Sequence, residues 1–269
     1  MPVLVTGVER SAGRACVRAL ARSGGEVRAY LDPLTGADDL VPRLRASGVK
    51  VARGTLDDEG TLELALAEAH TVVHAAADLM AEPDTLLDDA ATVLSAALGA
   101  GVRRLVLVSH LGAEDARDNP WLAALGDVEE LVADAPLETV TLRRTLTYGL
   151  DDAVTAALGQ STGGAQPDAM HMPIWVDDLA AGVAAADARD RAAGVLPHLV
   201  VVLGGPQLVS LGELVALLGG QVVDPAVAER TLPAHVIDVL SRDLAPPLDA
   251  PSAGTSPERG AAVIREHAT

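Results

Sequence analysis

Residues 3–13, VLVTGVERSAG, decide the fold of this chain. An aliphatic run leads directly into a turn that holds Gly7 and Gly13, and the following RACVRALARSG has the spacing of a helix with one apolar face. Gly7 permits the tight turn, and Gly13 lets the helix approach the strand closely. Free amide groups at the start of such a helix suit the pyrophosphate of a dinucleotide. The alternative is an ordinary strand-to-helix turn that binds nothing.

Short aliphatic runs alternate with helix-length patterns through the first half of the chain. This alternation is typical of a parallel sheet that is covered on both faces. Because strand–helix–strand crossovers are right-handed, we expect an α/β fold with a doubly wound parallel sheet. The expected strands are residues 3–5, 26–31, 50–53, 71–74, 104–108 and 138–142, and the expected helices are residues 12–23, 38–46, 58–69, 84–98 and 120–133.

The alternation weakens after Gly149, and the sequence predicts four parts. Residues 1–150 form the Rossmann core, and residues 151–172, which include a stretch rich in Gly, Pro and Ser, form a cap or lid loop. Residues 173–205 return to the sheet with a strand at 198–203. Residues 206–269 supply a small C-terminal substrate-binding cap with a helix at 210–218, and the Pro-, Ala- and Ser-rich residues 243–258 predict a mobile tail before a terminal helix.

Composition and charge exclude several classes of function. The net charge of −18 argues against nucleic acid and anionic membranes as partners, since both need a positive protein surface. No apolar run approaches the ~20 residues of a membrane span, and no leader is seen, so we expect a cytoplasmic, soluble protein. Cys16 is the only cysteine, which excludes an intramolecular disulfide. The histidines are too dispersed for a metal site.

Several segments, in this order, resemble the short-chain dehydrogenase/reductases of the extended and atypical types, including NmrA-like proteins. TGVERSAG resembles their TGxxGxxG loop, RRLVLVSHLGA their fifth strand, and LETVTLRRTLTYG their LRPxxxYG run. IWVDDLAAGV and VVVLGGPQLVSLGEL resemble two later segments of the family. The resemblance covers about residues 1–218 and implies a fold that binds NADH or NADPH.

The resemblance also assigns residues to the cofactor. They come from the glycine loop, from the ends of the second and third strands, from the HAAA stretch after the fourth strand and from the ends of the fifth and sixth strands. These residues are Thr6, Gly7, Glu9, Arg10, Ser11, Ala12, Gly13, Asp32, Leu56, Ala75, Ala76, Ala77, Ser109 and Arg144.

Two residues give opposite indications about the cofactor. Asp32 ends the second strand nineteen residues after Gly13, where a carboxylate favours the ribose 2′-hydroxyl of NAD. Arg10 replaces the middle glycine of the loop, and its guanidinium suits the 2′-phosphate of NADP. Asp32 also suits a turn before Pro33, which is the structural alternative. Thr55 replaces the family's adenine-contacting Asp, so neighbouring residues have to contact the base.

The catalytic Tyr-x-x-x-Lys pair of the family is missing. Trp121 stands where the Tyr is expected and Leu125 where the Lys is expected, and neither side chain titrates. We expect the carbonyl of a small-molecule substrate to be held instead by side chains near the ends of the fifth and sixth strands. The candidates for this catalytic role are Ser109, His110, Arg144 and Tyr148.

Two functions remain open. In the first, the protein is a ketoreductase for an apolar or polyketide-like molecule, and a hydroxylated substrate or water supplies the proton; the atypical angucyclinone ketoreductases of antibiotic pathways show a similar pattern. In the second, the protein is an NmrA-like dinucleotide sensor that regulates a protein partner. The cap favours the enzyme. Its expected substrate pocket contains Met170, His171, Met172 and Trp175.

Overall fold

A parallel sheet of seven strands forms the centre of the computed structural model, which describes residues 2–75, 78–189, 198–226, 228, 231–246 and 254–267. The order of the strands across the sheet is β10-β6-β5-β4-β1-β2-β3. Their bounds are Val3–Thr6 for β1, Val27–Leu31 for β2, Lys50–Arg53 for β3, Thr71–His74 for β4, Arg104–His110 for β5, Glu138–Arg144 for β6 and His198–Leu203 for β10. The expected doubly wound α/β fold is confirmed.

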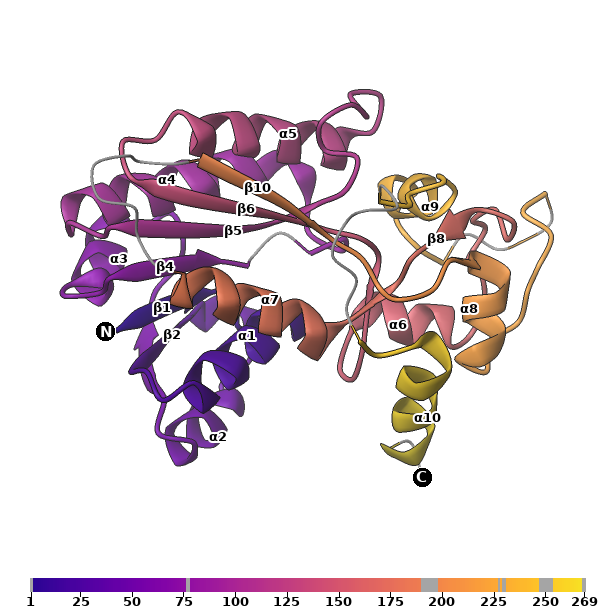
Figure 1. Ribbon diagram of the computed structural model, residues 1–269, viewed down its shortest axis with the longest axis horizontal. Helices are drawn as coiled ribbons and strands as arrows, with labels where there is room; N and C mark the ends of the chain where they lie inside the picture. The colour runs from indigo at the N-terminus through magenta and orange to yellow at the C-terminus, as the bar shows by residue number, and fades with distance from the viewer. Residues whose placement is uncertain are drawn as a thin grey trace.

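Helices cover both faces of this sheet (Figure 1). On one face lie α3 (Glu59–Leu66), α4 (Leu86–Gly99) and α5 (Pro120–Ala133), and on the other lie α1 (Ser11–Arg22), α2 (Leu40–Ala46) and α7 (Val176–Ala188). Leu105 and Leu107 of β5 enter the first core, whereas Val106 and Val108 enter the second. A strand with both faces buried has a continuous aliphatic run, as residues 105–108 of β5 do.

The remaining elements gather beyond one end of the sheet (Figure 1). They are β7 (Thr147–Tyr148), α6 (Ala153–Leu158), β8 (Met170–His171), β9 (Ile174–Trp175), β11 (Val209–Ser210), α8 (Leu211–Leu217), α9 (Ala234–Leu240) and α10 (Pro257–His267). Two 3₁₀ turns lie elsewhere: η1 (Pro33–Thr35) follows β2, and η2 (Pro83–Thr85) directly precedes α4. A terminal helix is therefore present as expected. Residues 247–253 of the predicted tail lie outside the described residues, and the four-part division of the chain stays a prediction.

Several predicted ends of elements were wrong. β5 continues to His110 and β6 to Arg144, because the two strands stay paired in register through these residues. α3 ends at Leu66 rather than at residue 69. Arg28 donates hydrogen bonds to the carbonyls of Ala65 and Ala67, which substitutes for another helical turn.

In the described part of the chain, no helix combines the length and the apolar character that crossing a membrane requires.

Candidate functional site

The turn between β1 and α1 has the geometry that its glycines predict. Gly7 adopts a left-handed conformation with φ of 71°. A Cβ atom on Gly13 would lie 2.1 Å from the carbonyl oxygen of Gly7, so only glycine allows this approach. Arg10 occupies the N-cap position of α1 without a side-chain capping bond, which leaves the first amide groups of the helix for another acceptor. These features fit the phosphates of a dinucleotide.

A cavity of about 510 Å³ opens beside this turn, at the carboxyl ends of β1, β2 and β3. Leu34, Leu56 and Leu86 give it apolar surface, and the side chain of Leu34 is 82% exposed. Tyr30 is the only aromatic residue in the described lining, so most of the apolar surface is aliphatic. The other residues that line the cavity are Gly7, Glu9, Arg10, Asp32, Thr35, Gly54, Thr55, Asp57, Ala81, Glu82, Thr85 and Asp89.

Other predicted residues of the glycine loop already have protein partners. Nε of Arg10 lies 3.3 Å from Oδ2 of Asp78. The Ser11 hydroxyl donates to Oδ2 of Asp152 at 2.8 Å, and Thr6 Oγ1 lies 2.9 Å from Nδ1 of His74. Ser11 and Ala12, with Asp78 and Asp152, line a second hollow of about 20 Å³, which is room for one water molecule.

The HAAA stretch after β4 is only partly described. Ala75 is buried, whereas Ala76 and Ala77, two of the predicted cofactor residues, lie outside the described residues. Asp78 follows directly and is largely buried, which raises the pKa of its carboxyl group. Neither Asp78 nor Asp152 was predicted from the sequence. The only signal was that each acid follows a segment expected at the cofactor.

Ser109 is committed to the protein interior. Its hydroxyl donates to Oε1 of Glu129 on α5, and the same carboxylate accepts from Nε and Nη2 of Arg143. The residue is 1% exposed. Ser109 thus belongs to a buried network between β5 and α5.

His110 ends β5 and is fully buried. Its Nδ1 lies 2.7 Å from the carbonyl oxygen of Leu111, and because a carbonyl only accepts, Nδ1 carries the proton. Within the described residues, Nε2 has no hydrogen-bond partner. Burial, with the charge of Arg144 as a second cause, lowers the pKa of His110 to about 3. The imidazole is therefore neutral at neutral pH, with Nε2 as a bare acceptor.

Arg144 ends β6 directly beside His110 in the sheet register. It is buried, and its Nε has no hydrogen-bond partner among the described residues. Burial lowers the pKa of this guanidinium, while the charges of Asp78 and Asp152 act in the opposite direction. The second hollow is lined by all three of these charged residues. Arg144 is thus a buried cation with an unused N–H group.

The predicted residues further along the chain lie in the short strands β7, β8 and β9, beyond the end of the sheet. The Tyr148 hydroxyl donates to the carbonyl of Ser256, and its ring packs edge-on against Trp175 with centroids 5.3 Å apart. The single proton of this hydroxyl is therefore used in a bond to the backbone. Nε2 of His171 donates to the carbonyl of Leu240, which leaves Nδ1 bare and, within the described chain, without a partner.

The two neighbours of His171 differ in what they contact. The backbone of Met170 hydrogen-bonds with Asp243 and Leu244. The carbonyl of Met172 accepts from the Thr145 hydroxyl and from the amide of Gly205. The backbone of each methionine therefore joins its strand or loop to a distant segment of the chain. Their place in a substrate pocket stays a prediction.

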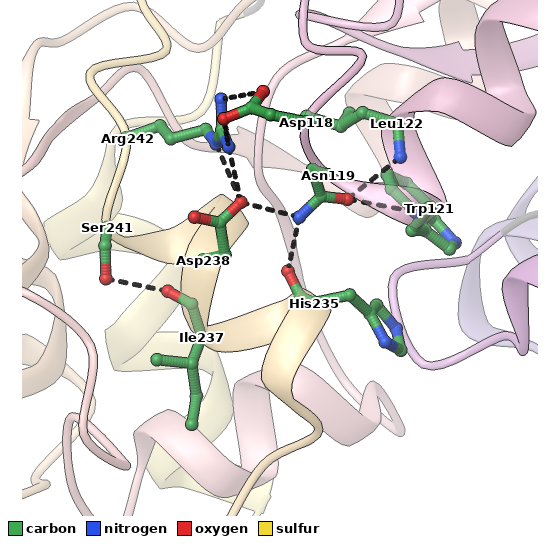
Figure 2. Close-up of polar contacts among 9 residues, drawn as sticks. All are labelled: Asp118, Asn119, Trp121, Leu122, His235, Ile237, Asp238, Ser241 and Arg242. Carbon is green, nitrogen blue, oxygen red and sulfur yellow. Dashed lines mark hydrogen bonds and ion pairs between the residues drawn. The ribbon is translucent and has the colours of Figure 1, made fainter.

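The start of α5, where the family has its catalytic Tyr, is a junction with the cap (Figure 2). Asn119 accepts from the amides of Trp121 and Leu122, and its Nδ2 donates to the His235 carbonyl at 3.1 Å and to Asp238 at 2.7 Å. Arg242 completes the contact, since it pairs with both Asp238 and Asp118. Sequence reasoning missed this junction because more than a hundred residues separate its two sides.

Trp121 and Leu125 are both fully buried. The Trp121 ring packs edge-on against His110, with centroids 5.4 Å apart. Within the described residues its indole Nε1 has no partner. At the position where the resemblance predicts the proton donor, the ring of Trp121 therefore packs beside His110.

Comparisons with known proteins agree with this geometry. A family model described as NAD(P)H-binding matches residues 7–186. No curated protein matches the chain. Two reductase structures are similar in fold: the NADPH-dependent quinone oxidoreductase of Escherichia coli complexed with NADPH (TM-score 0.74, 18% identity, 98% of this chain and 99% of that chain) and the Citrobacter sp. triphenylmethane reductase complexed with NADP(H) (TM-score 0.73, 16% identity, 96% and 98%).

An epimerase structure is equally similar. The UDP-glucose 4-epimerase of Bifidobacterium longum in complex with NAD⁺ and UDP gives a TM-score of 0.71 at 18% identity, over 97% of this chain and 96% of that chain. At such low identity the three structures establish the Rossmann-like fold alone. The fold and the family match together assign an NAD(P) cofactor.

Proposed function

Because this chain belongs to the NAD(P)H-binding family, we propose that it is a ketoreductase that uses NAD(P)H to reduce a carbonyl group on an apolar or polyketide-like small molecule. One observation carries the proposal: His110 and Arg144 end neighbouring strands as buried side chains, each with an unused nitrogen. Buried polar atoms without partners are rare, and at the carboxyl edge of a Rossmann sheet they are suited to a ligand.

The two nitrogens offer opposite hydrogen-bonding functions. Nε–H of Arg144 is a charged donor, which suits a carbonyl oxygen and the negative charge that grows on it during reduction. Nε2 of His110 is an acceptor, which suits a hydroxyl group or a water molecule. A substrate that carries a hydroxyl group near its carbonyl satisfies both.

The reaction needs a hydride, which the bound nicotinamide supplies to the carbonyl carbon. Arg144 stabilises the developing alkoxide, while a water molecule that donates one hydrogen bond to Nε2 of His110 gives its other proton to that oxygen, and the hydroxide ion that remains is reprotonated by solvent water. This scheme needs no titrating side chain at Trp121 or Leu125.

The test is cofactor oxidation with a series of hydroxylated aromatic ketones. His110→Asn keeps a donor near the position of Nδ1 but removes Nε2, and Arg144→Met removes the charged donor; we expect each to lower turnover by about 100-fold or more. His198→Gln is the matched control, because His198 begins β10 at the other end of the sheet and contacts Thr139.

If the His110→Asn and Arg144→Met variants turned over substrate as fast as the unaltered protein, the assignment of these residues would be contradicted. Tight dinucleotide binding without turnover of any ketone would contradict the ketoreductase. Such a result, together with a partner protein whose binding depends on the dinucleotide, would indicate the sensor.

A further inference from the structure

The cavity at the carboxyl ends of β1, β2 and β3 is strongly acidic. Five carboxylates line it against a single guanidinium among the described residues. The acids come from four separate segments of the chain and meet only in the fold. They are Glu9, Asp32, Asp57, Glu82 and Asp89, and the cation is Arg10.

Two of these acids are fixed against each other. Oε1 of Glu9 accepts a hydrogen bond of 2.6 Å from the backbone amide of Asp32. Oδ1 of Asp32 accepts from the amide of Leu34 at 2.7 Å and so caps η1. The turn role of Asp32 is therefore real, but it uses only one of the two carboxylate oxygens. Both carboxylates remain partly exposed beside the cavity.

Arg10 balances this charge only in part. Its Nε is paired with Asp78, a carboxylate outside the cavity lining, so one guanidinium is shared between that ion pair and the five acids. The charge of Arg10 still acts on Glu9, but it lowers the pKa of that carboxyl group less than burial raises it. The sequence left Arg10 and Asp32 as opposite indications, whereas the structure pairs Arg10 and adds Glu9 to the acidic side.

We propose that this cavity selects NAD(H) over NADP(H), with Glu9 and Asp32 together accepting hydrogen bonds from the hydroxyl groups of the adenosine ribose. A ribose 2′-hydroxyl donates to a carboxylate, whereas a 2′-phosphate has only acceptor oxygens and carries a charge of about −1.5 to −2. The proposal rests on the cofactor of the proposed function. The fold leaves the choice open, since similar structures hold NAD⁺ and NADP(H).

Glu9 is the part of this site that belongs to the present chain. A carboxylate at the end of the second strand is general among NAD-binding Rossmann folds. Glu9 instead comes from the glycine loop and reaches the same place through the amide of Asp32. Two acids on one ribose predict a stronger rejection of NADP than one acid gives.

The experiment is calorimetric titration of the whole protein with NAD⁺ and with NADP⁺. We expect NAD⁺ to bind at least about 100-fold more tightly, and Glu9→Gln and Asp32→Asn each to reduce this ratio by about tenfold. Asp134→Asn is the control, because it removes the same charge at the C-terminus of α5, outside the cavity. Circular dichroism checks that each variant is folded.

The outcomes separate the inference from the proposed function. NADP⁺ that binds as tightly as NAD⁺ overturns the inference and leaves the reductase intact. An unchanged ratio in Glu9→Gln overturns the role of Glu9. Binding of neither nucleotide at millimolar concentration overturns the cofactor of the proposed function itself. Should a variant fail to fold, the unaltered protein still tests the inference. If charge repulsion weakens the binding of NADP⁺, added salt has to decrease the ratio of the affinities for NAD⁺ and NADP⁺, because salt screens that repulsion.

Discussion

The carbonyl oxygen of Gly7 lies 2.1 Å from the point where a Cβ atom on Gly13 would stand. This contact joins the end of β1 to the first turn of α1 and leaves no room for any side chain. The atom in the way is backbone, which cannot rotate aside. The geometry of the dinucleotide turn therefore depends on this pair.

We expect Gly13→Ala to destabilise the protein by about 1–3 kcal/mol or more, since α1 has to move away from β1. Gly60→Ala is the matched control: Gly60 also lies in a helix, and its Cβ would meet only Oδ1 of Asp58 at 3.7 Å. That change should be neutral or slightly stabilising. Urea unfolding of both variants measures the difference, and equal midpoints would contradict the packing argument.

The junction of Asn119 with α9 gives a second prediction. Asn119→Asp keeps the acceptor that caps α5 but loses the donor to His235 and Asp238 and places two carboxylates together. We expect a loss of about 2 kcal/mol and faster hydrogen exchange across residues 231–246. Asn119→Ser, which keeps the cap without the second charge, should lose less. Unchanged exchange in the Asp variant would show that the junction does not hold α9.

The buried His74 predicts a loss of stability in acid. Burial lowers its pKa to about 4 from the 6.5 of an exposed histidine. The unfolded chain therefore binds a proton that the folded chain refuses, and stability falls as the pH drops through 6.5 towards 4. For this single group the loss near pH 4 is about 3 kcal/mol.

His74→Gln tests this prediction, because it retains a polar side chain for Thr6 and removes the titration. The measurement is the free energy of unfolding as a function of pH. We expect a shallower fall between pH 6.5 and about 4 in the variant. A variant with the same slope as the unaltered protein would assign the acid sensitivity to other groups, such as His110.

Cofactor selection should also depend on pH. Burial raises the pKa of both Glu9 and Asp89. The charge of Asp32 raises the pKa of Glu9 further, and the charges of Asp57 and Asp32 raise that of Asp89. Both acids therefore gain protons at a higher pH than exposed carboxyl groups do, and repulsion of a 2′-phosphate weakens as the pH falls. Arg10 and Glu82 line the same cavity, so their charges also act on a bound 2′-phosphate.

We expect the NAD⁺/NADP⁺ affinity ratio to decrease from about pH 8 to about pH 5. Protonation of the 2′-phosphate itself, with a pKa of about 6, acts in the same direction. Glu9→Gln isolates the contribution of Glu9, since it removes the titration of that group and leaves the phosphate unchanged. A pH dependence identical in the variant and the unaltered protein would exclude Glu9 as a cause.

The sequence by itself determined the fold, and it predicts the place of the cofactor. Gly7 and Gly13 between a strand and a helix, and the alternation of aliphatic strands with helices, are local patterns whose meaning does not depend on distant residues. The missing Tyr and Lys at Trp121 and Leu125 were equally legible. These features follow from the conformational freedom of single residues and from the period of burial.

Only the tertiary structure decided what each candidate side chain does. Ser109 follows Val108 in sequence like a catalytic serine, yet its hydroxyl is taken by Glu129 from a helix twenty residues away. Glu9 looked like one residue of a phosphate loop, whereas the fold bonds its carboxylate to the backbone amide of Asp32 at the end of β2. A polar group bonds with whatever partner the fold brings within about 3 Å, and no local pattern reports a partner that arrives from another element.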